Sequence, residues 1–525
     1  MTFANRNEQW KYDKDGLEII KEIPALADKA FKEIDPGDVE RLKWAGIYAQ
    51  RPRDGHFLVR VKLPSGQLTA EQAEVLAALA AEYGKGELQI TIRQAVQIHN
   101  ITLRDAIDIL PRLSAVGLSS VEACGDVPRT ILGNPLAGVD AEELLDTRPI
   151  VEEVFRFFLG NHAFSNLPRK FKISISANPH DAGFARINDL AFVPAKREGE
   201  VGFMAYVGGG LSAEPYLAER LPFFIRPAEV KAVAIAVATI FRDAGYREKR
   251  NHCRLKYLVA DLGIESVAEK VEAQTGALLR GDEEITAPWN YGRFYGVHAQ
   301  KQAGLSYVGV HVTNGHIAAE DLKAFAALAK RYGQGRLRTT NSQNLVLLDI
   351  PEGEVDTLLQ EEIFRTYPLK PGFFTGYASS CTGNAYCNFA PIETKHRLHA
   401  LTAALDAAFP EVGQPLRINL TGCFHACAQP QVADIGLTGG RARVGEETVP
   451  VYTVMVGGHL GKDAAFAAPL EGRVADANLG ALLKALVQQY LDLREAGEPF
   501  YATVARTGRD AWQSVVDQYA VGNNG

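Results

Sequence analysis

Apolar and polar positions follow two different periods along the chain. In "HFLVRVKLP", residues 56–64, and "LSYVGVHVT", residues 305–313, apolar side chains recur at about every second position, which is typical of strands. The Ala/Leu-rich run that follows each of them ends in Tyr-Gly-x-Gly and predicts a helix, and a β-branched strand comes next. The order strand, turn, helix, strand predicts a small α+β unit.

This unit occurs twice. Residues 64–101 align with residues 313–350 at a constant offset of 249. Between and after them lie longer segments that also match, at an offset of 245 that places Asp189-Leu190 on Asp434-Ile435. "YVGGGL" at 206–211 also matches "MVGGHL" at 455–460, at an offset of 249. The chain therefore alternates a small unit and a large α/β unit, which indicates a pseudo-two-fold with a site at its centre.

Composition narrows the class of protein. At 525 residues the chain is long enough for two to four domains, and its 46% hydrophobic and 23% charged residues are ordinary for a soluble protein. It has no apolar run of membrane-spanning length, and its polar N-terminal stretch does not resemble a secretory signal. Six cysteines are too few for a disulfide scaffold, so we expect a cytoplasmic protein. The net charge of −7 argues against nucleic acid as the main partner.

Four of the six cysteines form two closely spaced pairs, Cys381-x5-Cys387 and Cys423-x3-Cys427. Four thiolates on two loops suit a [4Fe–4S] cluster. Tetrahedral zinc is an alternative, although the x5 spacing is long for it. A third possibility is that the four are small buried apolar side chains. The two remaining cysteines, Cys124 and Cys253, have no such pairing, and we interpret both as packed thiols.

Several basic residues fall within apolar strand-like or turn sequences. Arg93 is expected inside a strand, Arg129 in a Gly/Pro-rich turn, and Lys170 and Lys172 on one face of a strand. A buried charge is costly unless it is paired, so these cations call for an anion, although ordinary ion pairing or a solvated edge strand would also explain them. The second copy has Ser342 at the position of Arg93, and Asn419 in the strand matched to that of Lys172. The cationic character thus belongs to one half of the repeat.

Glycine-rich motifs add little. "YVGGG" and "MVGGH" follow strands and could cradle a phosphate, but neither has the context of a nucleotide-binding fingerprint. We find no flavin or nicotinamide motif, so any electrons must come from another protein.

With these residues in hand, the chain resembles the sirohaem-dependent assimilatory sulfite and nitrite reductases. The resemblance extends from "RLKWAGIY" at 41–48 to the Gly-rich strand near 457, and rests above all on "CTGNAYC", "TGCFHAC" followed by "ADIG", "ACGDVPR" and "LPRKFK". It implies an internally duplicated α+β fold, with two ferredoxin-like half domains and two larger α/β sirohaem/iron–sulfur domains related by a pseudo-two-fold. The boundaries we expect are an N-terminal extension at 1–50, half domains at 51–115 and 286–360, a sirohaem-binding domain with the basic residues at 116–285, and the cysteine-bearing domain at 361–525.

The resemblance also implies roles for individual residues. The four paired cysteines match the [4Fe–4S] ligands, and Cys427 matches the thiolate that bridges to the sirohaem iron. Four cations match the residues that surround the substrate anion: Arg93, Arg129, Lys170 and Lys172. Arg93 and Arg129, together with Arg169 and Lys301, are also expected to help neutralise the sirohaem carboxylates, although a solvated loop is the simpler reading of Lys301.

The substrate implied is sulfite or nitrite. Members that reduce sulfite have Lys at the position of Lys172, whereas plant-type nitrite reductases tend to have Asn, so we expect sulfite reduction, with nitrite reduction or both activities as the alternative. The family's usual electron donor is ferredoxin, and we expect a monomer that binds neither nucleic acid nor membrane. Two readings outside this activity are a zinc-stabilised, non-catalytic repeat protein and an iron–sulfur electron-transfer subunit without sirohaem, which would leave the basic residues without a purpose.

Overall fold

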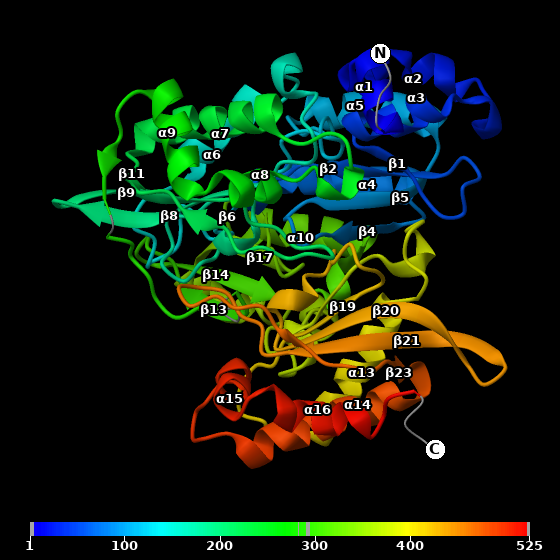
Figure 1. The fold of residues 1–525 in the computed structure, drawn as a ribbon, viewed down its shortest axis with the longest axis vertical. Coiled ribbons are helices and arrows are strands. Elements are labelled where there is room, and N and C mark those ends of the chain that lie inside the picture. Colours follow the sequence, from blue (N-terminus) through cyan, green and yellow to red (C-terminus); the bar gives the residue numbers. More distant parts are fainter. Residues whose placement is uncertain (1–4, 282, 290–293, 522–525) are drawn as a thin grey trace. The chain divides into compact units, whose positions relative to one another are not determined.

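The structure is a computed structural model that describes residues 5–281, 283–289 and 294–521 (Figure 1). Its contacts divide the chain into two compact units. The first extends to Leu369, apart from Leu211–Pro215, which belong with the second; the second otherwise begins at Lys370. Each unit is described by itself.

The first unit contains two five-stranded antiparallel sheets of the same design. One has the order β1(Ile47–Ala49)-β2(Phe57–Val61)-β5(Val96–Ile101)-β4(Glu87–Ile90)-β15(His316–Ala318), and the other β13(Gly296–Ala299)-β14(Leu305–Val310)-β17(Leu345–Pro351)-β16(Arg336–Thr339)-β3(Gln67–Thr69). The last strand of each comes from the other copy, because β15 pairs with β4 and β3 pairs with β16. The two copies of the small unit are therefore interlocked by an exchange of short edge strands.

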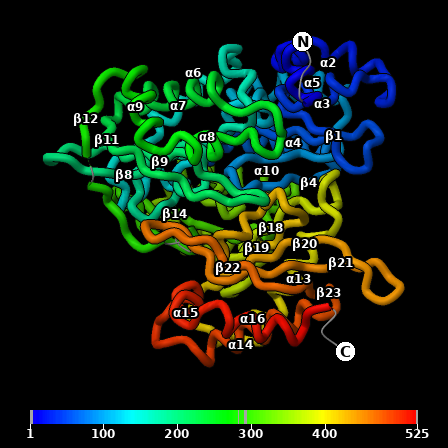
Figure 2. Tube along the Cα trace, in the orientation of Figure 1, coloured from blue at the N-terminus to red at the C-terminus, as the bar shows by residue number. Residues whose placement is uncertain are grey.

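Helices cover these sheets and share their core. α4(Ala70–Tyr83) packs against its equivalent α10(Ala319–Tyr332), and α5(Leu103–Ala115) packs against α4 and α2(Ile19–Ala27). α4 begins with a capping box, in which the Thr69 hydroxyl accepts from the Gln72 amide and the Gln72 side chain accepts from the Thr69 amide. The tube in Figure 2 shows α2 and α3(Pro36–Arg41) close to β1 and α5. One apolar cluster runs through both sheets and these helices, so the two small units fold as a single core.

The first unit also holds a larger sheet with the order β10(Glu219–Arg220)-β9(Glu200–Val207)-β8(Leu190–Arg197)-β7(Ile173–Ile175)-β6(Leu132–Gly133). β6, β7 and β8 are parallel, whereas β8 and β9 form a long antiparallel hairpin. α6(Arg148–Phe158), α7(Val230–Ala244), α8(Leu255–Leu262) and α9(Ile264–Thr275) contribute to the same core (Figure 1).

The second unit repeats this design. Its sheet has the order β18(Ser379–Ser380)-β19(Ile418–Thr421)-β20(Ile435–Val444)-β21(Glu447–Val456)-β22(Ala468–Pro469), with β23(Val474–Ala475) also paired to β21. β18, β19 and β20 are parallel, and β20 and β21 form the matching hairpin. α13(Lys395–Ala408), α14(Asp476–Leu493), α15(Phe500–Thr507) and α16(Arg509–Asp517) follow in the same chain order as α6 to α9. The duplicated α+β fold predicted from the sequence is confirmed.

The remaining elements are short: α1(Arg6–Asp13), β11(Phe223–Phe224), β12(Leu279–Arg280), α11(Val355–Leu358) and α12(Ile363–Thr366). Among the described residues we find no helix with the length and apolar character that a bilayer crossing requires.

Candidate functional site

Arg93 lies in the turn between β4 and β5, and not inside a strand as the sequence suggested. The turn closes with the Thr91 amide donating to the Ala95 carbonyl, and Arg93 thereby leaves the ladder. Its guanidinium donates to the Asn188 side chain at 2.9 Å and to the Thr130 carbonyl at 2.6 Å, while its buried Nε has no partner in the part of the chain described. Burial, followed by repulsion from Arg129, lowers the pKa of Arg93 to about 9.

Lys170 and Lys172 lie in the extended segment before β7, so the predicted strand begins later than expected. Of this segment only Phe171 makes a bridge, to Pro128. The Lys172 amide donates to the Asp189 carboxylate at 2.8 Å, but no hydrogen bond or ion pair of its ammonium is found among the described residues. Burial, with repulsion from Arg93 and Lys170 next, holds the pKa of Lys172 well below its usual value.

Asp189 offsets the charge of Lys172 only in part, because its carboxylate is paired with another cation. Arg254, just before α8, donates to it through Nε at 3.1 Å and through Nη2 to both oxygens at 2.8 Å. Asp189 is fully buried and Arg254 is 9% exposed. Sequence analysis missed Arg254, and no local signal links residues so far apart in the chain. The pair leaves the Lys172 charge available to an anion.

Arg129 lies in the loop before β6, as expected. Its guanidinium donates to the carbonyls of Gly125 at 2.7 Å and Ala123 at 3.3 Å. Burial alone would lower its pKa, but the thiol of Cys124 and the phenol of Tyr48 outweigh burial and raise it. In return, burial would raise the pKa of Cys124, yet Arg129 and further cations lower it overall. Cys124 is buried, as predicted, but in a strongly cationic environment.

Arg60 of β2 belongs to the same set of charges and was also missed. Its guanidinium donates to the Gln97 side chain and, at 3.0 Å, to the Tyr48 hydroxyl, and its charge acts on Arg93. A signal for it existed, because Arg60 interrupts an apolar strand pattern and the second copy has Gly309 at the equivalent position. The structure thus brings together the charges of all four predicted anion-binding residues, Arg93, Arg129, Lys170 and Lys172, with Arg60 and Arg254 beside them.

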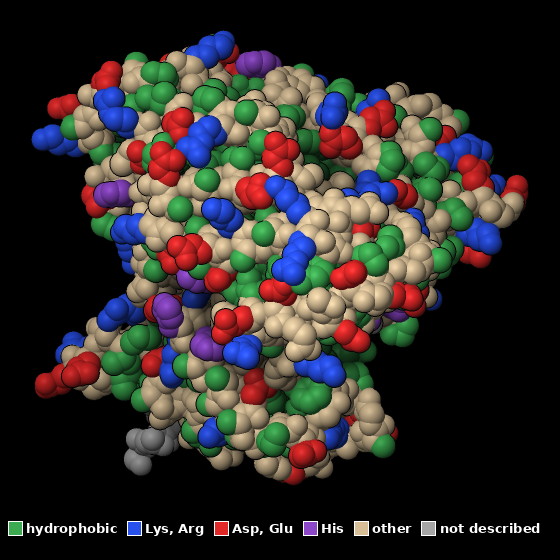
Figure 3. Space-filling model, turned by 180° about the vertical axis from the view of Figure 1, so that it is seen from behind, with side chains coloured by type: hydrophobic (Ala, Val, Ile, Leu, Met, Phe, Trp, Pro, Cys, Tyr) green, Lys and Arg blue, Asp and Glu red, His purple; other side chains and the backbone are tan. Residues whose placement is uncertain are grey.

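The cations of this cluster differ from those on the surface. On the face shown in Figure 3, Lys and Arg side chains are interspersed with Asp and Glu, as expected for a solvated surface. The members of the cluster are buried or half-buried, and the carboxylate among them, Asp189, is already paired. Such an excess of buried positive charge is costly unless an anion lies nearby or a proton is lost.

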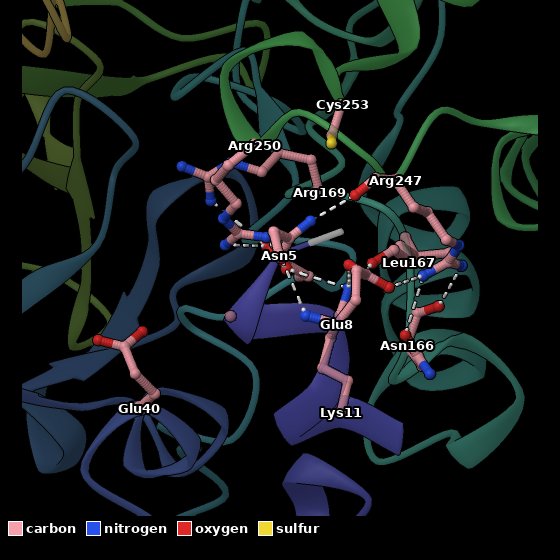
Figure 4. Close-up of polar contacts among 12 residues, drawn as sticks. Asn5, Glu8, Lys11, Glu40, Asn166, Leu167, Arg169, Arg247, Arg250 and Cys253 are labelled. Carbon is pink, nitrogen blue, oxygen red and sulfur yellow. Dashed lines mark hydrogen bonds and ion pairs between the residues drawn. The ribbon is translucent and has the colours of Figure 1, made fainter. Parts of the chain in front are cut away.

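Arg169, expected near sirohaem carboxylates, takes part in a buried ionic network. Its Nη1 lies 3.3 Å from the carboxylate of Asp126, which is 1% exposed and also pairs with Arg250 and Lys11. Figure 4 shows Lys11 and Glu8 of α1 beside Arg169 and Arg250. The network ties α1 to the segment that leads into Lys170 and Lys172. Burial lowers the pKa of Arg169, and the charge of Asp126 opposes this.

Lys301, the weakest of the sequence candidates, is exposed and forms an ion pair with Glu143 at 2.5 Å. Burial raises the pKa of this carboxyl group, and Lys301 acts against it. Its role toward a cofactor stays a prediction.

The paired cysteines lie in the second unit, directly after two neighbouring parallel strands. Cys381 follows β18, and Cys423 and Cys427 follow β19. The carboxyl ends of parallel strands meet at one edge of a sheet, which is where such folds bind ligands. Burial raises the pKa of Cys423 to about 12, and the neighbouring Cys427, Cys387 and Cys381 add to this. The four thiols are therefore near enough for their charges to interact.

The surroundings of these sulfur atoms fit an iron–sulfur cluster. The Gly422 amide donates to the Cys381 sulfur at 3.2 Å, and the Phe389 amide lies 3.4 Å from that of Cys387. A ring nitrogen of His425 is 3.4 Å from the Cys423 sulfur. Donors of this kind stabilise thiolates that carry the charge of a cluster. Across residues 5–281, 283–289 and 294–521, no group of three or more His, Cys, Asp or Glu residues could hold a single metal ion.

Comparison with known families agrees with both sets of residues. Residues 124–278 and 376–523 match the model of the nitrite and sulphite reductase 4Fe-4S domain. Residues 48–116 and 298–362 match the nitrite/sulfite reductase ferredoxin-like half domain. The chain belongs to the nitrite and sulfite reductase family. The two matches to each model correspond to the two copies of each unit.

Individual members of the family cover almost the whole chain. The chain is 40% identical over 469 residues to the ferredoxin–nitrite reductase of Synechococcus elongatus, covering 88% of this chain and 91% of that protein. It is 34% identical over 535 residues to sulfite reductase (ferredoxin) 2 of Mycolicibacterium paratuberculosis, covering 96% and 95%. The structure of the Mycobacterium tuberculosis NirA protein matches with a TM-score of 0.92 and 32% identity, over 98% of both chains.

Membership of the family indicates which cofactors the protein uses. The protein is an oxidoreductase that uses sirohaem and a [4Fe–4S] cluster. The thiols and their amide donors fit the cluster, and the excess of buried cations fits an anionic tetrapyrrole and an anionic substrate.

Proposed function

We propose that this protein reduces sulfite to sulfide with six electrons. The observation that carries the proposal is Lys172, a half-buried ammonium without a partner among the described residues, in a cluster with Lys170 and Arg93. Sulfite has three oxygens and is present partly as a dianion near neutral pH, so it gains more from an additional cation than the smaller, monoanionic nitrite does.

The chain's own residues would bind the anion and supply protons. Arg93 and Arg129 have planar guanidinium groups suited to two oxygens at once, whereas Lys170 and Lys172 are compact charges that also carry a transferable proton. A lowered pKa makes the Lys172 ammonium a better proton donor as each oxygen leaves as water. Fixed cations in a site with little water also stabilise the negative charge that develops on a departing oxygen.

The thiols would hold the redox centre. Cys381, Cys387, Cys423 and Cys427 are proposed as the four cluster ligands, with Cys427 also the link to sirohaem. When bound, the two cofactors supply the electrons one at a time, and the protein supplies charge, orientation and protons. The thiolate ligands favour a reducing compartment, so we place the reaction in the cytoplasm.

Nitrite reduction to ammonia is the second candidate. It is favoured by the relatives, since ferredoxin–nitrite reductases such as that of S. elongatus reach 40% identity. Both reactions take six electrons and would use the same cations, so the difference lies in relative rates.

The test is a side-by-side assay of the holoenzyme with sulfite and with nitrite, using a reduced dye as the electron source. We expect the larger kcat/KM with sulfite. A kcat/KM at least tenfold larger with nitrite would reassign the protein to nitrite reduction.

We also propose ferredoxin as the electron donor, because both relatives named above are called ferredoxin enzymes. A small acidic donor docks through exposed charges, so the rate with reduced ferredoxin should fall as salt rises. NADPH alone should support no turnover, and NADPH oxidation by the pure protein would contradict the proposal.

A further inference from the structure

Arg338 is a buried cation that lacks an anion. It lies in β16 and is 3% exposed. Its Nη1 donates to the carbonyl of its neighbour Leu337 at 2.8 Å, and its buried Nε has no partner among the residues that the structure describes. Within the described residues it forms no ion pair with a carboxylate. Burial, with repulsion from Arg336 and Arg148 next, lowers its pKa to about 9. A buried, unpaired guanidinium is costly and needs an explanation.

The neighbouring charges do not provide the missing anion, because each is already matched. Arg336 pairs with the buried Asp349 at 2.5 Å, and Arg148 pairs with Asp146 at 2.7 Å. The charges of all four act on Arg338. The group is therefore left with one positive charge in excess, and that charge belongs to Arg338.

A cavity adjoins this group of charges, because Asp146 and Arg148 line it. It has a volume of about 400 Å³ and is lined by Gln67, Asp146, Arg148, Pro149, Glu152 and Arg156. Gln67 of β3 is the register partner of Arg338, so both side chains project from the same face of the sheet. No hydrogen bond of the side-chain amide of Gln67 is found in the part of the chain that the structure describes. Arg156 pairs with Glu152 at 2.5 Å, so the rim of the cavity adds no net charge.

We propose that Arg338, Gln67 and Arg148 form a binding site for a small inorganic oxyanion of the sulfate type, separate from the cluster of Lys172. A guanidinium offers several donors in one plane, which matches the oxygens of such an anion, and the Gln67 amide adds a neutral donor. A single excess charge suits a small anion better than a polyanion. This site goes beyond the proposed reduction and does not depend on it.

The duplication provides a variant that should fold. Gln89 occupies the position of Arg338 in the first copy, 249 residues earlier, in the equivalent strand β4. It is also buried, at 5% exposure, so a neutral glutamine is compatible with this place in the half domain. Arg338→Gln therefore removes the charge with little change in shape. Arg156→Gln is the matched control, because it removes a cation from the rim of the same cavity that is already paired.

The experiment is equilibrium dialysis of the purified holoenzyme against radiolabelled sulfate at constant ionic strength. We expect Arg338→Gln to bind one sulfate fewer per chain than the wild type, and Arg156→Gln to bind as many as the wild type. Any sulfate bound at the Lys172 cluster is the same in the wild type and in both variants, so it does not affect the difference in bound sulfate between them. The proposal is overturned if Arg338→Gln binds as much sulfate as the wild type.

Thermal unfolding gives a second readout. Because only the folded protein binds the anion, sulfate should raise the apparent Tm of the wild type by about 1–3 °C more than that of Arg338→Gln. In chloride alone the variant should unfold at or above the wild-type temperature, since it no longer buries an unmatched charge. A variant that unfolds several degrees lower in chloride would show that Arg338 has a structural role and would overturn the proposal. Sulfite turnover should remain within twofold of the wild type.

Discussion

Two buried aspartates at equivalent positions, Asp189 and Asp434, are paired in opposite ways. In the second unit the Arg417 amide and guanidinium both donate to Asp434, at 2.9 and 2.8 Å, so one residue supplies the backbone and the side-chain contact. In the first unit Lys172 supplies only the backbone contact to Asp189, and the guanidinium comes from Arg254 on another segment. The cation at this position is therefore paired with its aspartate in the second copy, whereas the Lys172 ammonium in the first copy has no such pairing.

The two copies also use opposite ends of their parallel strands. In the first, the cations lie before β6 and β7; in the second, the thiols lie after β18 and β19. At the first-copy positions that match Cys423 and Cys427 lie Asn178 and Ala182, which cannot hold iron. We therefore propose that duplication was followed by a division of chemistry, with anion binding in the first copy and metal binding in the second.

The largest effect is expected from removing a thiol from the copy that carries the four paired cysteines. Cys423→Ser should lose most of its iron and visible absorption, and should reduce sulfite and nitrite about a hundredfold more slowly or worse, because the cofactors carry the electrons. Iron analysis and absorption spectra of the purified protein measure this.

Cys253→Ser is the control for this change. Its thiol donates to the Lys249 carbonyl at 2.9 Å, and burial raises its pKa to about 11, so it stays protonated and should bind no iron. If Cys253→Ser lost the cluster while Cys423→Ser kept it, the assignment of the ligands would be wrong.

The next largest effect is expected at the unmatched cation. Lys172→Asn keeps a hydrogen-bond donor and removes the charge, and should lower kcat/KM for sulfite by about tenfold to a thousandfold. Nitrite reduction should fall less or rise. Resting spectra should not change, because Lys172 ligates no metal. Equal losses with both anions would assign Lys172 to the cofactor or the fold.

A smaller effect should follow from making the first copy resemble the second. Arg254→Gln frees the Asp189 carboxylate, whose oxygen already accepts from the Lys172 amide, and the Lys172 ammonium can then turn toward it. We expect kcat/KM for sulfite to fall about tenfold, mainly through a higher KM, because a neutralised ammonium attracts the anion less.

The double variant Arg254→Gln/Asp189→Asn distinguishes this effect from simple loss of a buried ion pair. Breaking such a pair on one side costs about 3–5 kcal/mol, and removing both charges costs less. If the freed Asp189 carboxylate pairs with the Lys172 ammonium in the single variant, the double variant, which lacks that carboxylate, should regain sulfite activity. Failure to regain it in a folded, fully loaded protein would refute the role given to the pair.

The duplication and the cysteine pairs could be predicted from the sequence, because both depend on fixed spacings along the chain. The positions of Arg93 and Lys172 were less accessible. A period of two predicted strands through both, but a turn at Thr91 takes Arg93 out of the ladder, and β7 begins only at Ile173. Backbone pairing with partners elsewhere in the chain decides where a strand ends, and the local pattern does not contain it.

Non-local pairing also explains what the sequence did not reveal. The exchanged strands β3 and β15 are three residues each, too short for a periodic signal, and each pairs with a strand of the other copy. The contact of Arg254 with Asp189 joins residues 65 positions apart, and the sequence around neither residue contains a pattern that predicts it. The unpaired charge of Lys172, which distinguishes the two copies, could therefore be recognised only from the structure.

The smallest expected effect concerns protons. In the free enzyme the pKa of Lys172 is well below its usual value because of burial and the charges of Arg93 and Lys170. A bound anion offsets that repulsion and raises the pKa again. Between the two pKa values, binding takes up a proton, so affinity should fall as pH rises, by up to about tenfold per pH unit.

Nitrite is the suitable probe without reductant, because it does not titrate near neutral pH. Calorimetry in two buffers of different ionisation enthalpy should detect proton uptake by the wild type and less uptake by Lys172→Asn. In the second copy the equivalent cation is paired with Asp434, so we expect this pH dependence to come from the first copy. Equal proton uptake by the wild type and by Lys172→Asn would show that Lys172 is not its source.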